Sequence, residues 1–99
     1  MNVAFNAVHF KADKKLEEFI TEKLEKLGGL YDGIVGSEVI LKLENTEKPK
    51  NKIVEVRLII RGYALFAKKQ CKTFEEATDQ SVDALKKQLV KYKDKLRKK

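Results

Sequence analysis

The most chemically suggestive stretch of the sequence is its basic end, LKKQLVKYKDKLRKK, from Leu85 to Lys99. Eight of these fifteen residues are Lys or Arg, and Asp94 is the only acid among them. Ammonium groups bind phosphate oxygens, and a polyanion bound along the run would release its counterions. The run therefore predicts a polyanionic partner such as a nucleic acid. The alternative is a solvated helix end whose cations complement the helix dipole.

A mainly apolar stripe in and before this run has the spacing of an amphipathic helix. It consists of Phe74, Ala77, Ser81, Leu85, Leu89, Tyr92 and Leu96. One side of this stripe carries Lys86, Lys93 and Arg97, and the other carries Lys87, Lys91, Lys95 and Lys98. The helix dipole acts only over the last turn, whereas the basic run covers about four turns. The dipole alone therefore does not account for the run.

The positive charge is concentrated in the second half of the chain. Residues 1–50 carry eight Lys and nine acids, for a net charge of −1. Residues 51–99 carry fourteen basic residues and six acids, for a net charge of +8. Such asymmetry is typical of proteins that bind a polyanion and, less often, of proteins that bind an acidic membrane surface.

The composition predicts one domain in a reducing compartment. A chain of 99 residues with 42 % hydrophobic content is long enough to bury its own core. The single cysteine, Cys71, excludes an intramolecular disulfide and a CxxC metal site. No apolar run approaches the roughly 18 residues of a membrane span, and the first residues lack the pattern of a signal peptide. We therefore expect a cytoplasmic protein with one domain over residues 1–99.

Catalysis has little support in the sequence. His9 and Cys71 lack a third group that would orient or activate them, so a catalytic pair is disfavoured. Cys71 is better explained as a small sheet residue, and His9 either contacts RNA or terminates a strand. No set of residues in the sequence therefore supports the activity of a small hydrolase. We expect no enzymatic activity, no catalytic residue and no cofactor.

Two further groups of residues have structural explanations. Acids near the start of the final helix interact favourably with the positive end of the helix dipole. This explanation is preferred to a metal site, and no metal site is expected. These acids are Glu75, Glu76, Asp79 and Asp83. The tyrosines Tyr31, Tyr63 and Tyr92 are expected to be packing or loop residues. The alternative for Tyr63 is a stacking contact with a nucleobase.

Hydrophobic periodicity predicts the elements that position these residues. Residues 2–9 alternate loosely and are expected to form a strand. Apolar residues recur at helical spacing from Leu16 to Leu27, which indicates an amphipathic helix that Asp13 caps and two glycines end. A loop rich in turn residues is expected over residues 30–36.

Three further strands and the final helix follow. Residues 37–44, 52–61 and 64–72 show the alternation of half-buried strands. The segment with the only proline is expected to be a hairpin connection, Gly62 the next turn, and Thr73 the cap of the final helix. Three strands with short links should be antiparallel neighbours, and both helices can cover one sheet face. The sequence therefore predicts an α+β sandwich.

Several segments together resemble a known family. They are AVHF at the end of the first strand, EKLEKL in the first helix and EEATDQSVDALKKQLVKYKDK in the final helix. This ordered set resembles the ribosome hibernation-promoting factor and ribosome-associated inhibitor family, also called sigma-54 modulation proteins, over essentially the whole chain. The resemblance implies a β-α-β-β-β-α fold similar to double-stranded-RNA-binding domains, with a four-stranded sheet and two helices on one face.

The resemblance also implies a function and partners. Family members occupy the messenger and transfer RNA channel of the small ribosomal subunit and inhibit translation under stress or in stationary phase. The expected partners are that subunit and its ribosomal RNA, with a second hibernation factor as a further candidate, and neither a membrane nor a small-molecule substrate. Because the sequence stops at Lys99, we expect a short form without the carboxy-terminal dimerisation domain. The alternative function is a free-standing RNA-binding module with another structured RNA target.

The RNA-facing candidates are carried over from the family by position. They are Lys23, Lys26, Lys86, Lys87, Lys91, Lys93 and Lys95, with Arg97 and His9 as further candidates. The chain departs from many relatives at Lys68, Lys69 and Lys72, where those relatives turn acidic. This departure would shift some RNA contacts toward the fourth strand.

Overall fold

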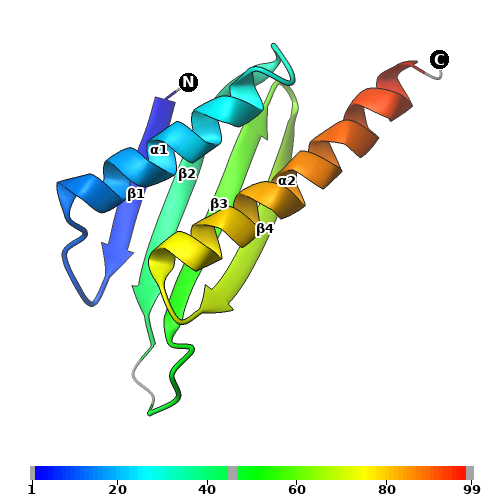
Figure 1. Ribbon diagram of the computed structural model, residues 1–99. Coiled ribbons are helices and arrows are strands. Elements are labelled where there is room, and N and C mark those ends of the chain that lie inside the picture. The colour runs from blue at the N-terminus through cyan, green and yellow to red at the C-terminus, as the bar shows by residue number, and fades with distance from the viewer. Residues whose placement is uncertain (1, 45–46, 98–99) are drawn as a thin grey trace.

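The computed structural model describes residues 2–44 and 47–97, and the side chains of Leu96 and Arg97, like all of Lys98, lie outside its described part. Four strands and two helices follow one another along the chain (Figure 1). They are β1 (Asn2–Val8), α1 (Lys14–Gly28), β2 (Ile34–Leu43), β3 (Lys52–Ile60), β4 (Tyr63–Cys71) and α2 (Phe74–Arg97). This β-α-β-β-β-α order confirms the predicted α+β fold.

The four strands form one sheet in the order β1-β2-β3-β4. β2 and β3 pair antiparallel, and so do β3 and β4, as the short links between them predict. β1 pairs parallel to β2, because the chain crosses through α1 and returns to the same end of the sheet. Sequence neighbours are therefore sheet neighbours throughout.

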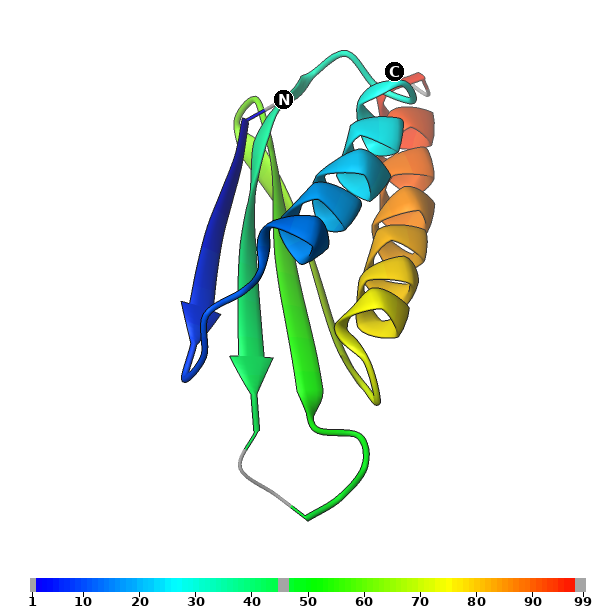
Figure 2. The same ribbon diagram turned by 60° about the vertical axis from the view of Figure 1, so that its left-hand side comes forward.

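Both helices cover the same face of the sheet, and the opposite face carries no helix (Figure 2). The hydrophobic core fills the space between the two layers. The helices contribute Ile20, Leu24, Leu27, Ala77, Leu85 and Leu89 to it. The sheet contributes Val39, Leu41, Val54, Val56, Leu58, Leu65, Ala67 and Cys71. None of the described helices is both long and apolar enough to cross a membrane.

Both helices begin at the predicted capping residues. The carboxylate of Asp13 accepts a hydrogen bond from the backbone N–H of Leu16 at 2.7 Å, at the start of α1. The hydroxyl of Thr73 accepts one from the N–H of Glu76 at 3.0 Å, at the start of α2. These caps satisfy backbone donors that have no partner within the helix.

The start of β2 differs from the prediction. Residues 34–36 were expected in a loop, but β2 begins at Ile34, which pairs with Ile60 across an irregular register. Gly36 pairs with Asn2 of β1, and a Cβ on this glycine would lie 2.9 Å from the Asn2 carbonyl oxygen. The glycine, which suggested a turn, instead permits the close approach of β1.

We predict that Ser81→Ala stabilises the protein. The hydroxyl of Ser81 is fully buried in α2 and has no hydrogen-bond partner among the described residues. Removing a desolvated hydroxyl and gaining helix propensity should raise the free energy of unfolding by about 1 kcal/mol, measured by urea denaturation. The matched control is Thr78→Val, because the buried Thr78 hydroxyl does donate to the Phe74 carbonyl, at 2.7 Å, and its loss should not stabilise. A less stable Ser81→Ala variant would contradict the prediction.

Candidate nucleic-acid interface

The packing of α2 fixes the directions in which its lysines point. α2 runs diagonally across β3 and β4, and Leu85 and Leu89 are completely buried beneath it (Figure 1). Lys86 lies on the side of α2 that faces α1, whereas Lys91 and Lys95 lie on the side next to β4. The structure thus places basic residues on both sides of the apolar stripe, as the helical spacing predicts.

The first group of candidate residues lines a groove between the two helices. The groove is lined by Lys23, Lys26, Leu27, Leu30, Asp79, Val82, Asp83 and Lys86. The ammonium group of Lys23 lies 3.3 Å from a carboxylate oxygen of Asp79 and 5.4 Å from the centre of the Phe19 ring. Lys26 and Lys86 are exposed and have no ion-pair partner in the described part of the chain. They are therefore the two lysines of this groove that are open to a phosphate.

Lys93 has a structural contact on the same side of α2. Its ammonium group donates a hydrogen bond to the backbone carbonyl of Leu30, at 2.6 Å, and the side chain is half-buried. This bond ties the C-terminal half of α2 to the segment that follows α1. Lys93 therefore helps to hold the two helices together, and its ammonium group is less accessible than those of its neighbours.

The second group of candidates lies on the outer side of α2. Lys87 pairs with Asp83 at 3.4 Å, but both side chains are mostly exposed, and such surface pairs contribute little free energy. Lys91 and Lys95 are exposed and have no ion-pair partner among the residues that the structure describes. These three lysines, which we call the outer lysine row, are therefore all exposed to solvent on one side of α2.

An aromatic cluster, which the sequence did not predict, borders the outer lysine row. The rings of Tyr63 and Tyr92 stack with their centroids 5.3 Å apart and an interplanar angle of 9°. Tyr31 and Tyr92 pack edge to face, with a centroid distance of 5.9 Å and an interplanar angle of 78°. The three rings come from three separate segments, so no sequence spacing could have revealed the cluster. The predicted packing role is confirmed for Tyr31 and Tyr92, which are partly buried, whereas Tyr63 remains mostly exposed.

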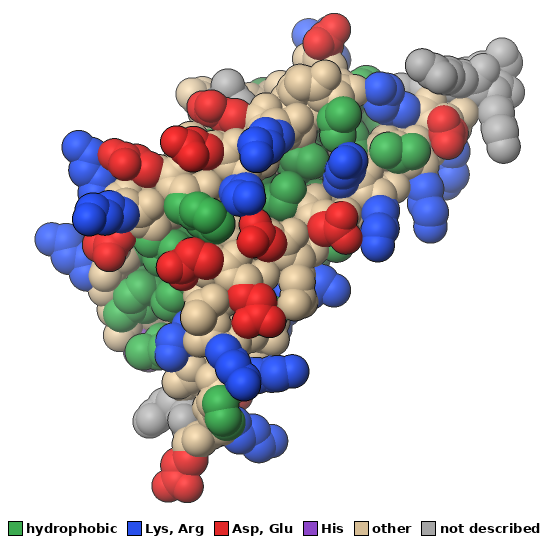
Figure 3. Space-filling model, viewed as in Figure 1, with side chains coloured by type: hydrophobic (Ala, Val, Ile, Leu, Met, Phe, Trp, Pro, Cys, Tyr) green, Lys and Arg blue, Asp and Glu red, His purple; other side chains and the backbone are tan. Residues whose placement is uncertain are grey.

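The charge distribution distinguishes the helix side from the open sheet face. Figure 3 shows Lys and Arg side chains gathered over the C-terminal half of α2 and acidic side chains over its beginning. On the open face, the ammonium nitrogen of Lys42 lies 2.8 Å from a carboxylate oxygen of Glu55. A guanidinium nitrogen of Arg57 lies 3.8 Å from a carboxylate oxygen of Glu38. These pairs offset charge on the central strands. In α2 the charge is uneven, because residues 74–84 hold four acids and no basic residue, whereas residues 85–97 hold six basic residues and one acid. Surplus positive charge therefore lies on the second half of α2.

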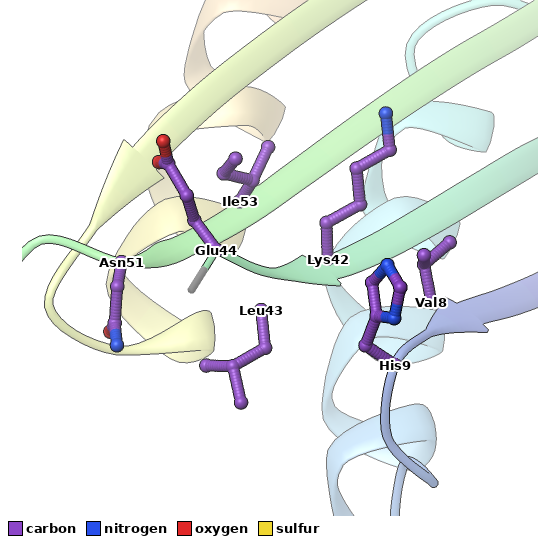
Figure 4. A pocket seen from close by; sticks show the side chains of 7 residues that line it. All are labelled: Val8, His9, Lys42, Leu43, Glu44, Asn51 and Ile53. Carbon is purple, nitrogen blue, oxygen red and sulfur yellow. The ribbon is translucent and has the colours of Figure 1, made fainter. Parts of the chain in front are cut away.

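His9 lies away from the candidate lysines. It directly follows β1, at the end of the sheet opposite to the C-terminal half of α2 (Figure 1). Its backbone adopts a φ of 70°, a left-handed conformation that His tolerates better than most residues. Figure 4 shows its ring beside Lys42 in a pocket that Glu44 also lines. Because this backbone conformation is not extended, β1 ends directly before His9, in agreement with the prediction that His9 terminates the strand.

His9 and Cys71 do not form a catalytic pair. His9 follows β1 and Cys71 is the last residue of β4. These are the two outer strands of the sheet, which three strand spacings, roughly 14 Å, separate. Cys71 is buried, as predicted for a small sheet residue, whereas His9 is exposed. In the described part of the chain, no three His, Cys, Asp or Glu side chains form a group that could hold a metal ion.

A family model described as "Sigma 54 modulation protein / S30EA ribosomal protein" matches residues 3–97. The chain belongs to this family. Curated relatives named "Ribosome hibernation promoting factor" support the assignment. The relative from Pseudomonas putida is 30 % identical over 95 residues, which cover 96 % of this chain and 89 % of the relative. The relative from Escherichia coli strain K12 is 31 % identical over 97 residues, which cover 98 % and 96 %.

Solved structures show that the fold is shared. A ribosomal subunit interface protein from Coxiella burnetii has a TM-score of 0.83 and 21 % identity, over 95 % of this chain and 99 % of that one. The N-terminal domain of Protein Y from Thermus thermophilus has a TM-score of 0.81 and 19 % identity, over 93 % and 99 %. The predicted family and fold are thus confirmed. The family's description names a ribosomal protein, in agreement with the expectation of a non-enzymatic protein.

We predict that the Cys71 thiol is unreactive in the folded protein. Burial raises the pKa of this thiol, and the nearby Glu76 carboxylate raises it further, whereas Lys50 and Lys69 lower it. Because the thiolate is the nucleophile, a raised pKa keeps the group protonated at pH values where an ordinary thiol already reacts. A disulfide reagent should modify native Cys71 far more slowly than the urea-unfolded chain at the same pH. Equal rates in both states would contradict this prediction.

Proposed function

We propose that the protein is a hibernation factor that occupies the messenger and transfer RNA channel of the small ribosomal subunit and thereby inhibits translation. Family membership and the names of the relatives support a ribosome-associated hibernation factor. The observation that carries the proposed RNA contact is the outer lysine row. It presents three exposed ammonium groups along one side of a rigid helix, and those of Lys91 and Lys95 have no ion-pair partner among the described residues.

The proposed contact is with the RNA backbone rather than with particular bases. Lysines bind phosphates as point charges and carry no sequence information. Structured RNA is recognised mainly by shape and by contacts to phosphates and 2′-hydroxyl groups. Lys26 and Lys86 face the groove between the helices, so α2 offers cations on two sides. A helix with cations on both sides can lie between two phosphate backbones.

The proposed inhibition requires no chemistry. A domain wedged into the channel excludes messenger and transfer RNA sterically, and its affinity comes from phosphate neutralisation and counterion release. The family assignment and the structural separation of His9 from Cys71 agree with this non-enzymatic mechanism. On this proposal, the protein acts in the cytoplasm, where ribosomes work.

We predict that changing the outer lysine row, Lys87, Lys91 and Lys95, to Gln weakens ribosome binding and preserves the fold. Affinity of the unchanged protein should fall by about a thousandfold between 50 and 200 mM salt if roughly six phosphates are contacted. Losing three contacts should lower the salt slope by about two to three units, while stability changes by only a few tenths of a kcal/mol. The measurements are ribosome affinity against salt concentration and thermal unfolding.

The matched control for this variant is the change of Lys11, Lys14 and Lys15 to Gln. These three lysines are also exposed, and the change removes the same total charge at the start of α1. The control should keep nearly all of its affinity and salt slope. Equal losses in the two variants would show that only net charge matters, and an unchanged slope in the first would assign the outer row to a solvated helix end.

We also predict that the protein competes with transfer RNA and messenger. If it occupies the channel, small subunits loaded beforehand with initiator transfer RNA and messenger should bind it much more weakly than empty subunits do. Co-sedimentation of the protein with loaded and empty subunits, at one salt concentration, measures this difference. Full binding to loaded subunits would place the site outside the channel.

A further inference from the structure

The aromatic cluster beside the outer lysine row leaves one large ring open to solvent. Tyr63 begins β4, and 55 % of the residue is exposed. Its ring stacks on Tyr92 with an interplanar angle of 9°, so Tyr92 covers one face of the ring. More than half of the residue nevertheless remains exposed to solvent. An exposed, flat ring on the rim of a folded domain is a platform on which a second flat group can stack.

The position of this ring is fixed by its surroundings. Tyr63 pairs with Ile60 across a two-residue turn, and Gly62 in that turn adopts a φ of 74° that other residues rarely take. Tyr92 is in turn held by an edge-to-face contact with Tyr31. A ligand that stacks on Tyr63 therefore meets a ring that is already ordered, which lowers the entropic cost of binding.

Positive charge surrounds the open ring. Tyr63, Leu65, Gln88, Lys91, Tyr92 and Lys95 line one hollow at the edge of β4. The amide of Gln88 donates one N–H to the Phe66 carbonyl at 2.9 Å, which leaves its second N–H and its oxygen for a ligand. The hollow therefore offers a ligand the exposed ring, two ammonium groups and part of this amide. Exposed Arg61, in the turn before Tyr63, adds a further cation nearby.

The comparison with Phe66 separates this site from exposed aromatic surface in general. Phe66 is also about half exposed, at 52 %, but it lies on the open sheet face. Its neighbour in the sheet register is Arg57, which already pairs with Glu38. Acids accompany the cations near Phe66, because Glu38 lies beside Arg57 and Glu55 is the register partner of Lys68. Tyr63 instead lies beside two lysines that lack an ion-pair partner in the described chain.

We propose that Tyr63, with Lys91 and Lys95, forms a binding site for an unpaired nucleobase of RNA, in which the base stacks on the Tyr63 ring and the adjoining phosphates contact the two lysines. An aromatic platform beside a basic track is the usual arrangement for binding single-stranded nucleic acid. Bases within a duplex already stack on one another and cannot reach the ring. The site therefore gives the domain a preference for a looped or single-stranded segment. This inference rests on the RNA-binding role proposed above and adds the class of RNA element.

The first experiment uses the absence of tryptophan from the chain. Tyr63→Trp places a fluorophore at the proposed site, and Phe66→Trp is the matched control on the open sheet face. A short single-stranded RNA should quench the fluorophore at position 63 and leave the one at position 66 unchanged. A blunt RNA duplex of equal charge should quench neither. Equal quenching at both positions, or stronger quenching by the duplex, would overturn the site.

The second experiment measures the contribution of stacking to affinity. Tyr63→Ala should weaken binding of single-stranded RNA by roughly five- to a hundredfold, as expected for the loss of one base stack, whereas Tyr63→Phe should bind normally. Thermal unfolding of each variant controls for the packing lost at Tyr92. Ribosome affinity is measured for Tyr63→Ala and for the outer-row variant, so that the nucleobase site and the proposed function are tested separately. Loss of ribosome affinity in that variant, with single-stranded RNA affinity unchanged in Tyr63→Ala, would overturn the nucleobase site and leave the proposed function standing.

Discussion

The packing of the apolar stripe of α2 onto β3 and β4 is the interaction on which the other features depend. Leu85 and Leu89 are completely buried, and each such side chain contributes about 1.5 to 3 kcal/mol through burial. Once these two leucines face the sheet, the rotation of α2 about its axis is fixed. Every lysine at helical spacing then takes a definite direction, toward α1 or toward the edge of β4.

The same packing explains why the two faces of the molecule differ. Because both helices cover one side, the strands alternate between core residues and residues of the open face. On the central strands, the open face pairs its charges across the sheet, as Lys42 does with Glu55. α2 has few acids in its second half, so its lysines cannot be balanced within the helix. Surplus positive charge is therefore a property of the second half of α2.

The sequence predicted features that depend on local patterns. The two caps at Asp13 and Thr73, the antiparallel strands and the two basic sides of α2 all follow from spacing along one segment. Features that depend on distant segments could not be predicted in the same way. The stack of Tyr63 on Tyr92 and the hydrogen bond from Lys93 to the segment after α1 both join residues that no periodicity links.

The misassigned start of β2 shows a second reason why sequence patterns fail. A glycine between turn residues indicates a loop when only its neighbours along the chain are considered. In the fold, Gly36 lies against the backbone of Asn2 and belongs to a strand, because β1 needs space that a side chain would fill. The conformational freedom of glycine and its small size are separate properties. Which of them a position uses is decided by the strand that packs beside it.

The outer lysine row carries an energetic cost in the free protein that its proposed partner would remove. Lys87 and Lys91, and Lys91 and Lys95, are like charges at a spacing of four residues, and each pair weakens a helix by a few tenths of a kcal/mol. The burial of Leu85 and Leu89 exceeds this cost several-fold, so α2 stays folded without a ligand. Phosphates bound along the row would replace repulsion with attraction. On the proposed function, the core holds in advance an arrangement of charge that RNA would make more favourable. Because the helix is already ordered, its ordering would not be part of the free energy of binding.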